Sequence, residues 1–172
     1  MKFKIDKIIL IIFFSCIFYL FSCQNQKNQE LDIDGFNGDF IAIKDFKTNL
    51  ESNACRDKDY HFSISISSKL DSIQNYEASN DTITKRHQYV FVYELGIEDK
   101  IPDPFKEIEK ENYSVFLPSE LGNFSFDYSL NRKGNLNLVF IITDQLYYLV
   151  EEKNKIRLID DKAILQIPVI TK

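Results

Sequence analysis

Hydrophobic and polar residues alternate along much of the chain after residue 35, in the pattern of half-buried β-strands. In Tyr60–Ser67 the apolar positions Tyr60, Phe62, Ile64 and Ile66 alternate with a histidine and serines. Residues two apart in a strand point to the same face, so one face of this segment packs in a core and the other meets water. Phe124–Leu130 repeats the same alternation.

Shorter apolar segments separated by turn-forming residues predict the remaining strands. Strands at a spacing of roughly 8–12 residues are typical of sandwiches. We therefore predict an all-β fold over residues 35–172, an antiparallel β-sandwich of the immunoglobulin-like or a related type with about 8–9 strands; a β-barrel is the alternative. The further predicted strands are Phe40–Ile43, Gln88–Leu95, Tyr113–Leu117, Leu136–Ile142, Gln145–Val150, Ile156–Ile159 and Ala163–Val169.

Polar pairs and clusters predict the turns between the later strands. Asn131–Asn135 predicts a hairpin that places Phe124–Leu130 beside Leu136–Ile142, with both apolar rows facing one core. Val139 and Ile141 lie on the opposite face, which predicts that the second of these strands is central. Further turns are expected at Thr143-Asp144, Glu152–Lys155 and Asp160-Asp161.

Little helix is expected. Pro104–Lys110 has a proline at its first position and could form two turns of helix. The stretch Ser68–Arg86 shows no clear period, and we predict a long polar loop there, with at most a turn of helix.

The N-terminus has the organisation of a secretory signal. A start containing three lysines is followed by Ile8–Phe21, which is almost entirely apolar and ends at Ser22 and Cys23. This length, about 14 residues, suits the hydrophobic core of a signal peptide. A spanning helix needs about 20 residues.

Leu20, Ser22 and Cys23 resemble the lipobox of bacterial lipoproteins, with Phe21 larger than the residue usual at that position. The resemblance implies a signal peptide over residues 1–22, cleavage between Ser22 and Cys23, and lipidation (diacylglyceryl, with palmitate-type acyl chains) at Cys23. Residues 23–34 would be a tether to the membrane. Several acyl chains make a stable anchor. An uncleaved N-terminal anchor helix is the alternative.

Charge narrows the set of partners. The chain has a net charge of −5 although residues 1–22 carry +2, so the mature portion is still more acidic. An acidic protein repels phosphate backbones, which argues against nucleic acid. Membrane attachment would depend on the anchor at Cys23. By resemblance to lipoproteins that lack an aspartate after the lipidated cysteine, Gln24 favours the outer membrane.

One segment has some features of a calcium loop. Asp32, Asp34 and Asp39 surround two glycines, and hard cations prefer several oxygen ligands on a tightly turned backbone. Phe36 occupies a position where a ligand would be needed. A polar turn before the first strand is the simpler interpretation, and no cofactor or metal is assigned.

No pattern of catalytic residues is present. His61 and His87 are far apart, and no nucleophile, phosphate loop or zinc motif accompanies them. Cys55 is expected to be a partly buried residue with no disulfide partner in the mature chain. An exposed tyrosine at Tyr147 or Tyr148, on opposite strand faces, could bind a peptide or glycan.

These features favour a lipid-anchored cell-envelope lipoprotein with a non-catalytic domain that binds an envelope protein or peptide, or supports an assembly. Two alternatives remain open: an envelope hydrolase whose site is assembled from distant residues, and a small-ligand carrier with an internal apolar cavity.

Overall fold

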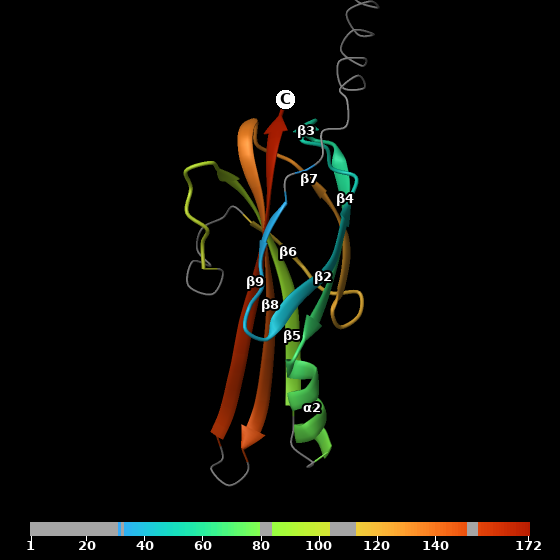
Figure 1. Ribbon diagram of the computed structural model, residues 1–172, viewed down its shortest axis with the longest axis vertical. Coiled ribbons are helices and arrows are strands. Elements are labelled where there is room, and N and C mark those ends of the chain that lie inside the picture. The colour runs from blue at the N-terminus through green and yellow to red at the C-terminus, as the bar shows by residue number, and fades with distance from the viewer. Residues whose placement is uncertain (1–30, 32, 80–83, 104–112, 151–154) are drawn as a thin grey trace, which may run out of the picture.

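The computed structural model describes residue 31 and residues 33–79, 84–103, 113–150 and 155–172. Two antiparallel sheets face one another across a hydrophobic core (Figure 1). The sheets remain separate and do not close into a barrel. The predicted all-β sandwich is therefore confirmed.

The larger sheet, sheet A, has the strand order β1-β9-β8-β5-β6, and the two-residue strand β3 also pairs with β9. The long antiparallel strands β5, β8 and β9 form its centre. The strand bounds are β1 Asp34–Phe36, β3 Asn53–Ala54, β5 Thr84–Gly96, β6 Tyr113–Phe116, β8 Gly134–Val150 and β9 Lys155–Thr171.

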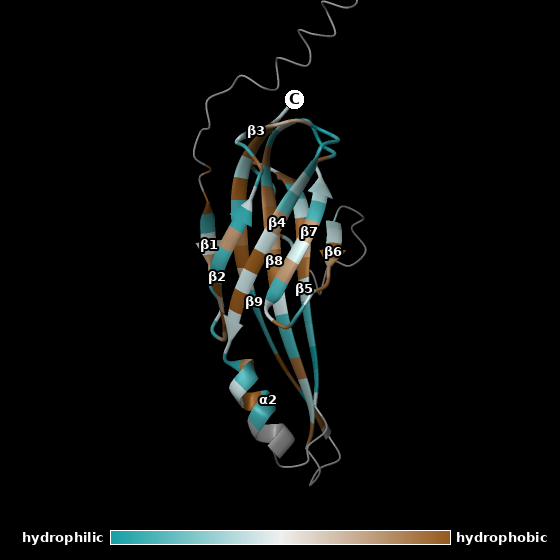
Figure 2. Ribbon diagram, turned by 90° about the vertical axis from the view of Figure 1, so that its right-hand side faces the viewer, coloured by the Kyte–Doolittle hydropathy of each residue, from teal (hydrophilic) through white to brown (hydrophobic). Residues whose placement is uncertain are grey.

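The smaller sheet, sheet B, has the order β2-β4-β7, with β2 at Ile41–Thr48, β4 at Asp59–Ser68 and β7 at Asn123–Ser129. Buried side chains alternate with exposed or half-buried ones along β4 and β7, as the sequence pattern predicted. For example, Phe62 of β4 pairs with Phe126 of β7, and both side chains are buried. Figure 2 shows the resulting change of hydropathy from residue to residue along these strands.

The main core lies between the two sheets. Phe62 and Phe140 are both 0% exposed, and their ring centroids lie 5.1 Å apart across the sandwich. Phe46 of β2 and Phe126 of β7 complete a cluster of rings around them. Leu31, inside the segment expected to be a tether, also packs against this core.

Two predicted turns are wrong. Thr143-Asp144 lies inside β8 and Asp160-Asp161 lies inside β9, and the two strands pair over 17 residues each. The aspartate at the second position of each pair has a partner from elsewhere in the fold: Asp144 binds Arg86, and Asp161 accepts backbone hydrogen bonds. A polar pair within a strand is stable when its groups are satisfied in this way.

The predicted hairpin at Asn131–Asn135 is also wrong. β7 belongs to sheet B and β8 to sheet A, so the segment between them crosses from one sheet to the other. The apolar residues of both strands nevertheless face one core, as expected. The prediction that the second strand is central is confirmed, since β8 lies between β5 and β9 with Val139 and Ile141 buried on its other face.

Beyond sheet B, strands β5, β8 and β9 continue as a three-stranded extension (Figure 1). Helix α2, Leu70–Ser79, contacts β5 and β8 there, on the side of sheet A that faces sheet B. We call this part of the molecule the α2 end. The helix corrects the predicted loop, and the Ser68 hydroxyl caps it by accepting a hydrogen bond from Leu70 N at 3.1 Å. The helix expected at Pro104–Lys110 lies outside the described residues.

Candidate functional site

Two of the three candidate metal ligands, Asp34 and Asp39, lie in the described part of the chain. Asp34 lies in β1 opposite Gln166 of β9, and Asp39 is exposed in the connection to β2. Asp32, Ser22 and Cys23 lie outside the described residues. In the part of the chain that is described, no three His, Cys, Asp or Glu side chains form a group able to hold a metal ion.

Cys55 is half-buried, as expected, and it is disulfide-bonded. The expectation that Cys55 has no disulfide partner concerned the mature chain, from which Cys16 would be removed and in which Cys23 would be lipidated.

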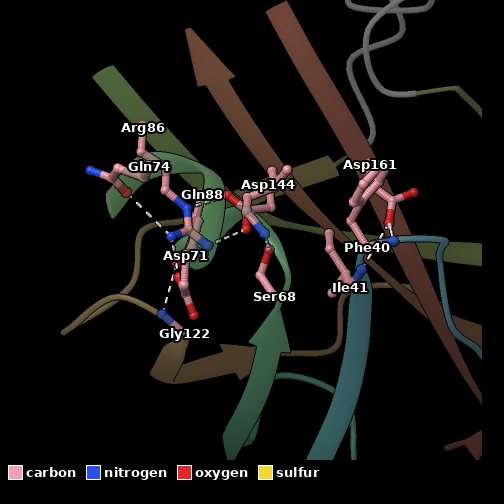
Figure 3. A network of polar contacts seen from close by, with 11 residues as sticks. Phe40, Ile41, Ser68, Asp71, Gln74, Arg86, Gln88, Gly122, Asp144 and Asp161 are labelled. Carbon is pink, nitrogen blue, oxygen red and sulfur yellow. Dashed lines mark hydrogen bonds and ion pairs between the residues drawn. The ribbon is translucent and has the colours of Figure 1, made fainter. Parts of the chain in front are cut away.

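A buried ion pair joins α2 to sheet A (Figure 3). The Arg86 guanidinium of β5 donates two hydrogen bonds to the Asp144 carboxylate of β8, at 2.8 and 2.6 Å. It also donates to Asp71 and to Gln74 of α2. The side chains of Arg86 and Asp144 are only 3% and 0% exposed, so this bidentate pair is desolvated.

This arrangement fixes the helix and does not offer reactive groups. Burial alone would lower the pKa of Arg86, but the hydrogen bonds and charges of Asp144 and Asp71 outweigh it and raise that pKa. The guanidinium therefore stays charged and keeps the buried carboxylate paired. Sequence reasoning missed the pair because its partners are 58 residues apart.

A second buried carboxylate organises the connection from β7 to β8. Glu94 accepts hydrogen bonds from the Tyr128 hydroxyl at 2.9 Å and from the backbone N–H groups of Asn131 and Arg132 at 2.8 and 2.7 Å. Burial, followed by the charge of Glu94, raises the pKa of Tyr128, which keeps the phenol protonated as a donor. The polar pocket beside them, about 560 Å³, includes Asp99 and Tyr113.

The exposed face of sheet B brings together three residue types used in acyl transfer. His61 Nδ1 lies 2.8 Å from Asp127 Oδ1, and Ser125 Oγ lies 3.4 Å from His61 Nε2. His61 is on the solvent face, as expected. The order of contacts matches a nucleophile, a base and an orienting carboxylate. However, the side chains of His61 and Asp127 are 53% and 69% exposed, and neither lines a described pocket.

Sheet A has one face packed against sheet B and another that faces away from it. This second face, which we call the outer face, carries a row of aromatic side chains. Along β5 the ring centroids of His87 and Tyr89 are 6.2 Å apart, and those of Tyr89 and Phe91 are 6.1 Å apart. Tyr113 of β6 continues the row beside Phe91 at 5.8 Å and contacts Tyr93. Phe91 and Tyr93 of this row are buried and form a second small core with Val139 and Ile141, against which the half-buried Tyr89 and Tyr113 pack.

At the α2 end this row leads into an apolar groove on the outer face. Tyr147 packs edge-on to His87, with centroids 5.7 Å apart. The groove has a volume of about 360 Å³ and is lined by Lys85, His87, Tyr147, Tyr148, Leu149 and Ile156. It is open at the surface, unlike the internal cavity expected of a small-ligand carrier. Among these residues, the sequence pointed to the tyrosine pair as a possible binding element, whereas His87 was considered only as a catalytic or metal-binding residue.

The outer face contains an unusual polar group as well. Thr143 of β8 is 0% exposed, and its hydroxyl has no hydrogen-bond partner among the described residues. Thr143 lies between Tyr89 of β5 and Lys162 of β9 in the sheet register. Buried hydroxyls normally have a hydrogen-bond partner, and packing alone does not explain why the Thr143 hydroxyl is buried without one in the described part of the chain.

Within the described residues, no helix is long and apolar enough to cross a membrane. Comparison with models of protein families, with curated proteins and with solved structures finds no match to this chain.

Proposed function

We propose that the protein is a lipid-anchored cell-envelope lipoprotein whose β-sandwich is a non-catalytic binding or assembly-support domain. The observation that supports a binding role is the aromatic row on the outer face of sheet A, which ends in an apolar groove. Tyrosine combines a large apolar ring with a polar tip, and for this reason it is enriched in binding surfaces. The anchor rests on the sequence Leu20–Cys23.

The hydrolase alternative has one observation in its favour, the Ser125–His61–Asp127 contacts. An activated serine also needs donors aimed at the developing oxyanion in a site shielded from water. The His61–Asp127 pair is more than half exposed, so solvent screens the charge that would stabilise an imidazolium. A binding role therefore agrees better with the geometry.

Chemistry links the proposed anchor to Cys55. A Cys23 sulfur that carries a thioether-linked lipid cannot join a disulfide, and Cys16 would leave with the signal peptide. Lipidation at Cys23 and an intramolecular disulfide at Cys55 are therefore mutually exclusive in the mature chain. The mass of the mature protein, measured after extraction from membranes, distinguishes the two states.

Substitution of Cys23 tests the anchor directly. We expect Cys23→Ala to block processing, so that the variant accumulates as precursor or leaves the membrane fraction. Cys55→Ala, the matched control, should remain lipidated and membrane-bound. Processing and anchoring of Cys23→Ala at parental levels would contradict the proposal, and separation of the two membranes on a density gradient tests outer-membrane residence.

The binding face is tested separately. We expect Tyr89→Ser or Tyr113→Ser to reduce the recovery of envelope proteins cross-linked to the protein in intact cells. Ser63→Ala on the exposed face of sheet B is the control and should leave this set unchanged. Equal cross-linking by all three variants would argue against the outer face as the binding surface.

A further inference from the structure

The groove at the α2 end combines an accessible volume with an apolar lining. Its volume, about 360 Å³, lies within the range of small-molecule pockets, about 300–1,000 Å³. Sheet register places Leu149 of β8 opposite Ile156 of β9, and Tyr147 opposite Leu158. The floor is therefore a continuous apolar surface contributed by adjacent strands.

Two aliphatic side chains of this surface are exposed to solvent. Ile156 is 72% exposed and Leu158 is 48% exposed. A single exposed aliphatic side chain is ordinary. Two exposed aliphatic residues next to an apolar groove form a contiguous patch, which is typical of a ligand or interaction site.

The described lining of the groove contains basic side chains and no acidic ones. The basic residues are Lys85 and His87. Asp160, a carboxylate on the same face, is separated from His87 by Gln145 on the intervening strand. A basic rim on an apolar groove is notable in a chain with a net charge of −5.

We propose that this groove binds a fatty-acid-type amphiphile, a single acyl chain that ends in a carboxylate. The acyl chain lies on Tyr147, Leu149 and Ile156, because each methylene removed from water adds favourable transfer free energy. The carboxylate meets the Lys85 ammonium, which selects an anionic head group over a neutral one. This inference takes the outer face of sheet A as the binding face, as proposed above, but it does not depend on lipidation of Cys23.

Photo-crosslinking tests the site in the full chain. The protein is reconstituted in phosphatidylcholine nanodiscs and irradiated with a diazirine-bearing, alkyne-tagged long-chain fatty acid, and labelled residues are mapped by mass spectrometry. We expect labels at the residues of the groove. Ile156→Asp should reduce labelling at least about tenfold, because it places a charge on the apolar floor. Leu117→Asp, at a 67% exposed leucine outside the groove, is the control and should label normally.

Competition tests the head-group preference. Dodecanoic acid should displace the probe about fivefold better than dodecanol, and Lys85→Ala should remove this difference. Lys133→Ala, in the exposed connection from β7 to β8, should retain it. Thermal melts of each variant separate loss of binding from loss of folding.

Four outcomes would overturn the inference. Labelling outside the groove, or labelling that Ile156→Asp leaves unchanged, excludes the site. Equal competition by the acid and the alcohol in the parent protein excludes the role of Lys85. A dimer that Ile156→Asp dissociates and dodecanoic acid leaves intact would identify a second copy of the chain as the occupant. Because nanodiscs retain either a lipidated or an uncleaved chain, failure here is distinguishable from failure of the Cys23 anchor.

Discussion

At the residue scale, the buried Arg86–Asp144 pair and the exposed His61–Asp127 pair give contrasting predictions. Asp144→Asn removes the buried one of the two carboxylates that pair with Arg86, whose side chain is only 3% exposed, and we expect a loss of about 3–5 kcal/mol in unfolding free energy. Asp127→Asn, at a pair more than half exposed, should cost at most about 1 kcal/mol. Urea unfolding followed by circular dichroism measures both, and equal losses would contradict the difference in burial.

Core residues and their strand neighbours give a second contrast. We expect Phe126→Ala and Phe140→Ala each to cost about 2–5 kcal/mol, through lost transfer free energy and the cavity that remains. Phe140 should be the more costly, because it is 0% exposed whereas Phe126 is 8% exposed. Ser125→Ala and Asn137→Ala, on the opposite strand faces, should change the melting temperature little. A similar shift for all four variants would mean that the strand register is wrong.

Because the Ser125–His61–Asp127 contacts are exposed to solvent, we expect that Ser125 does not act as a nucleophile. We expect no covalent labelling of Ser125 by a fluorophosphonate and no hydrolysis of p-nitrophenyl acetate beyond that of the Ser125→Ala variant. Stoichiometric labelling of Ser125 that disappears in His61→Asn would instead support the hydrolase alternative.

At the scale of elements, Gly38 determines how β2 docks on β9. Asp161 Oδ2 accepts hydrogen bonds from Phe40 N at 2.6 Å and Ile41 N at 2.8 Å, which ties the start of β2 to sheet A (Figure 3). A Cβ at position 38 would lie 2.5 Å from Lys162 O and would also meet the Asp161 carboxylate. The start of β2 therefore lies too close to β9 to leave room for a side chain at position 38.

Gly38→Ala should destabilise the protein by about 1–3 kcal/mol, because the backbone of β9 must move. Gly35→Ala is the matched control: its Cβ would lie 3.4 Å from the Leu165 side chain and 3.7 Å from a backbone oxygen, close to ordinary contact distances. Hydrogen exchange should show faster exchange at Phe40 and Ile41 in Gly38→Ala only. If the amide exchange rates of Phe40 and Ile41 did not change in Gly38→Ala, Gly38 would not be required for the docking of β2.

The same scale shows why some elements were predictable. The Tyr60–Ser67 alternation is local, and the strand forms where expected, as β4. The helix at Leu70–Ser79 has little amphipathic pattern in its sequence; it is held by Asp71 and Gln74 binding Arg86, a partner outside the helix. Local pattern does not report such a contact.

At the scale of the whole molecule, a chain from Leu31 to Lys172 should fold without the N-terminal segment. Leu31 packs against the core, so this start retains every described core contact. We expect a soluble product, monomeric or weakly associated, with a circular dichroism spectrum dominated by β-structure. A spectrum dominated by helix, or a product that unfolds without cooperativity, would contradict an independent domain.

The sequence alone determined that the domain is all-β, which strands alternate and which apolar rows face a core, because these properties follow from the two-residue period of a strand. Only the tertiary structure decided that β7 and β8 belong to different sheets. It also decided that Thr143-Asp144 and Asp160-Asp161 continue strands instead of turning, since the partners of Asp144 and Asp161 are distant in sequence. The aromatic row and the groove likewise arise from strand order, because pairing of β5, β6, β8 and β9 places their outward side chains side by side. Local periodicity specifies which face a residue occupies, whereas the neighbours on that face are specified by long-range pairing.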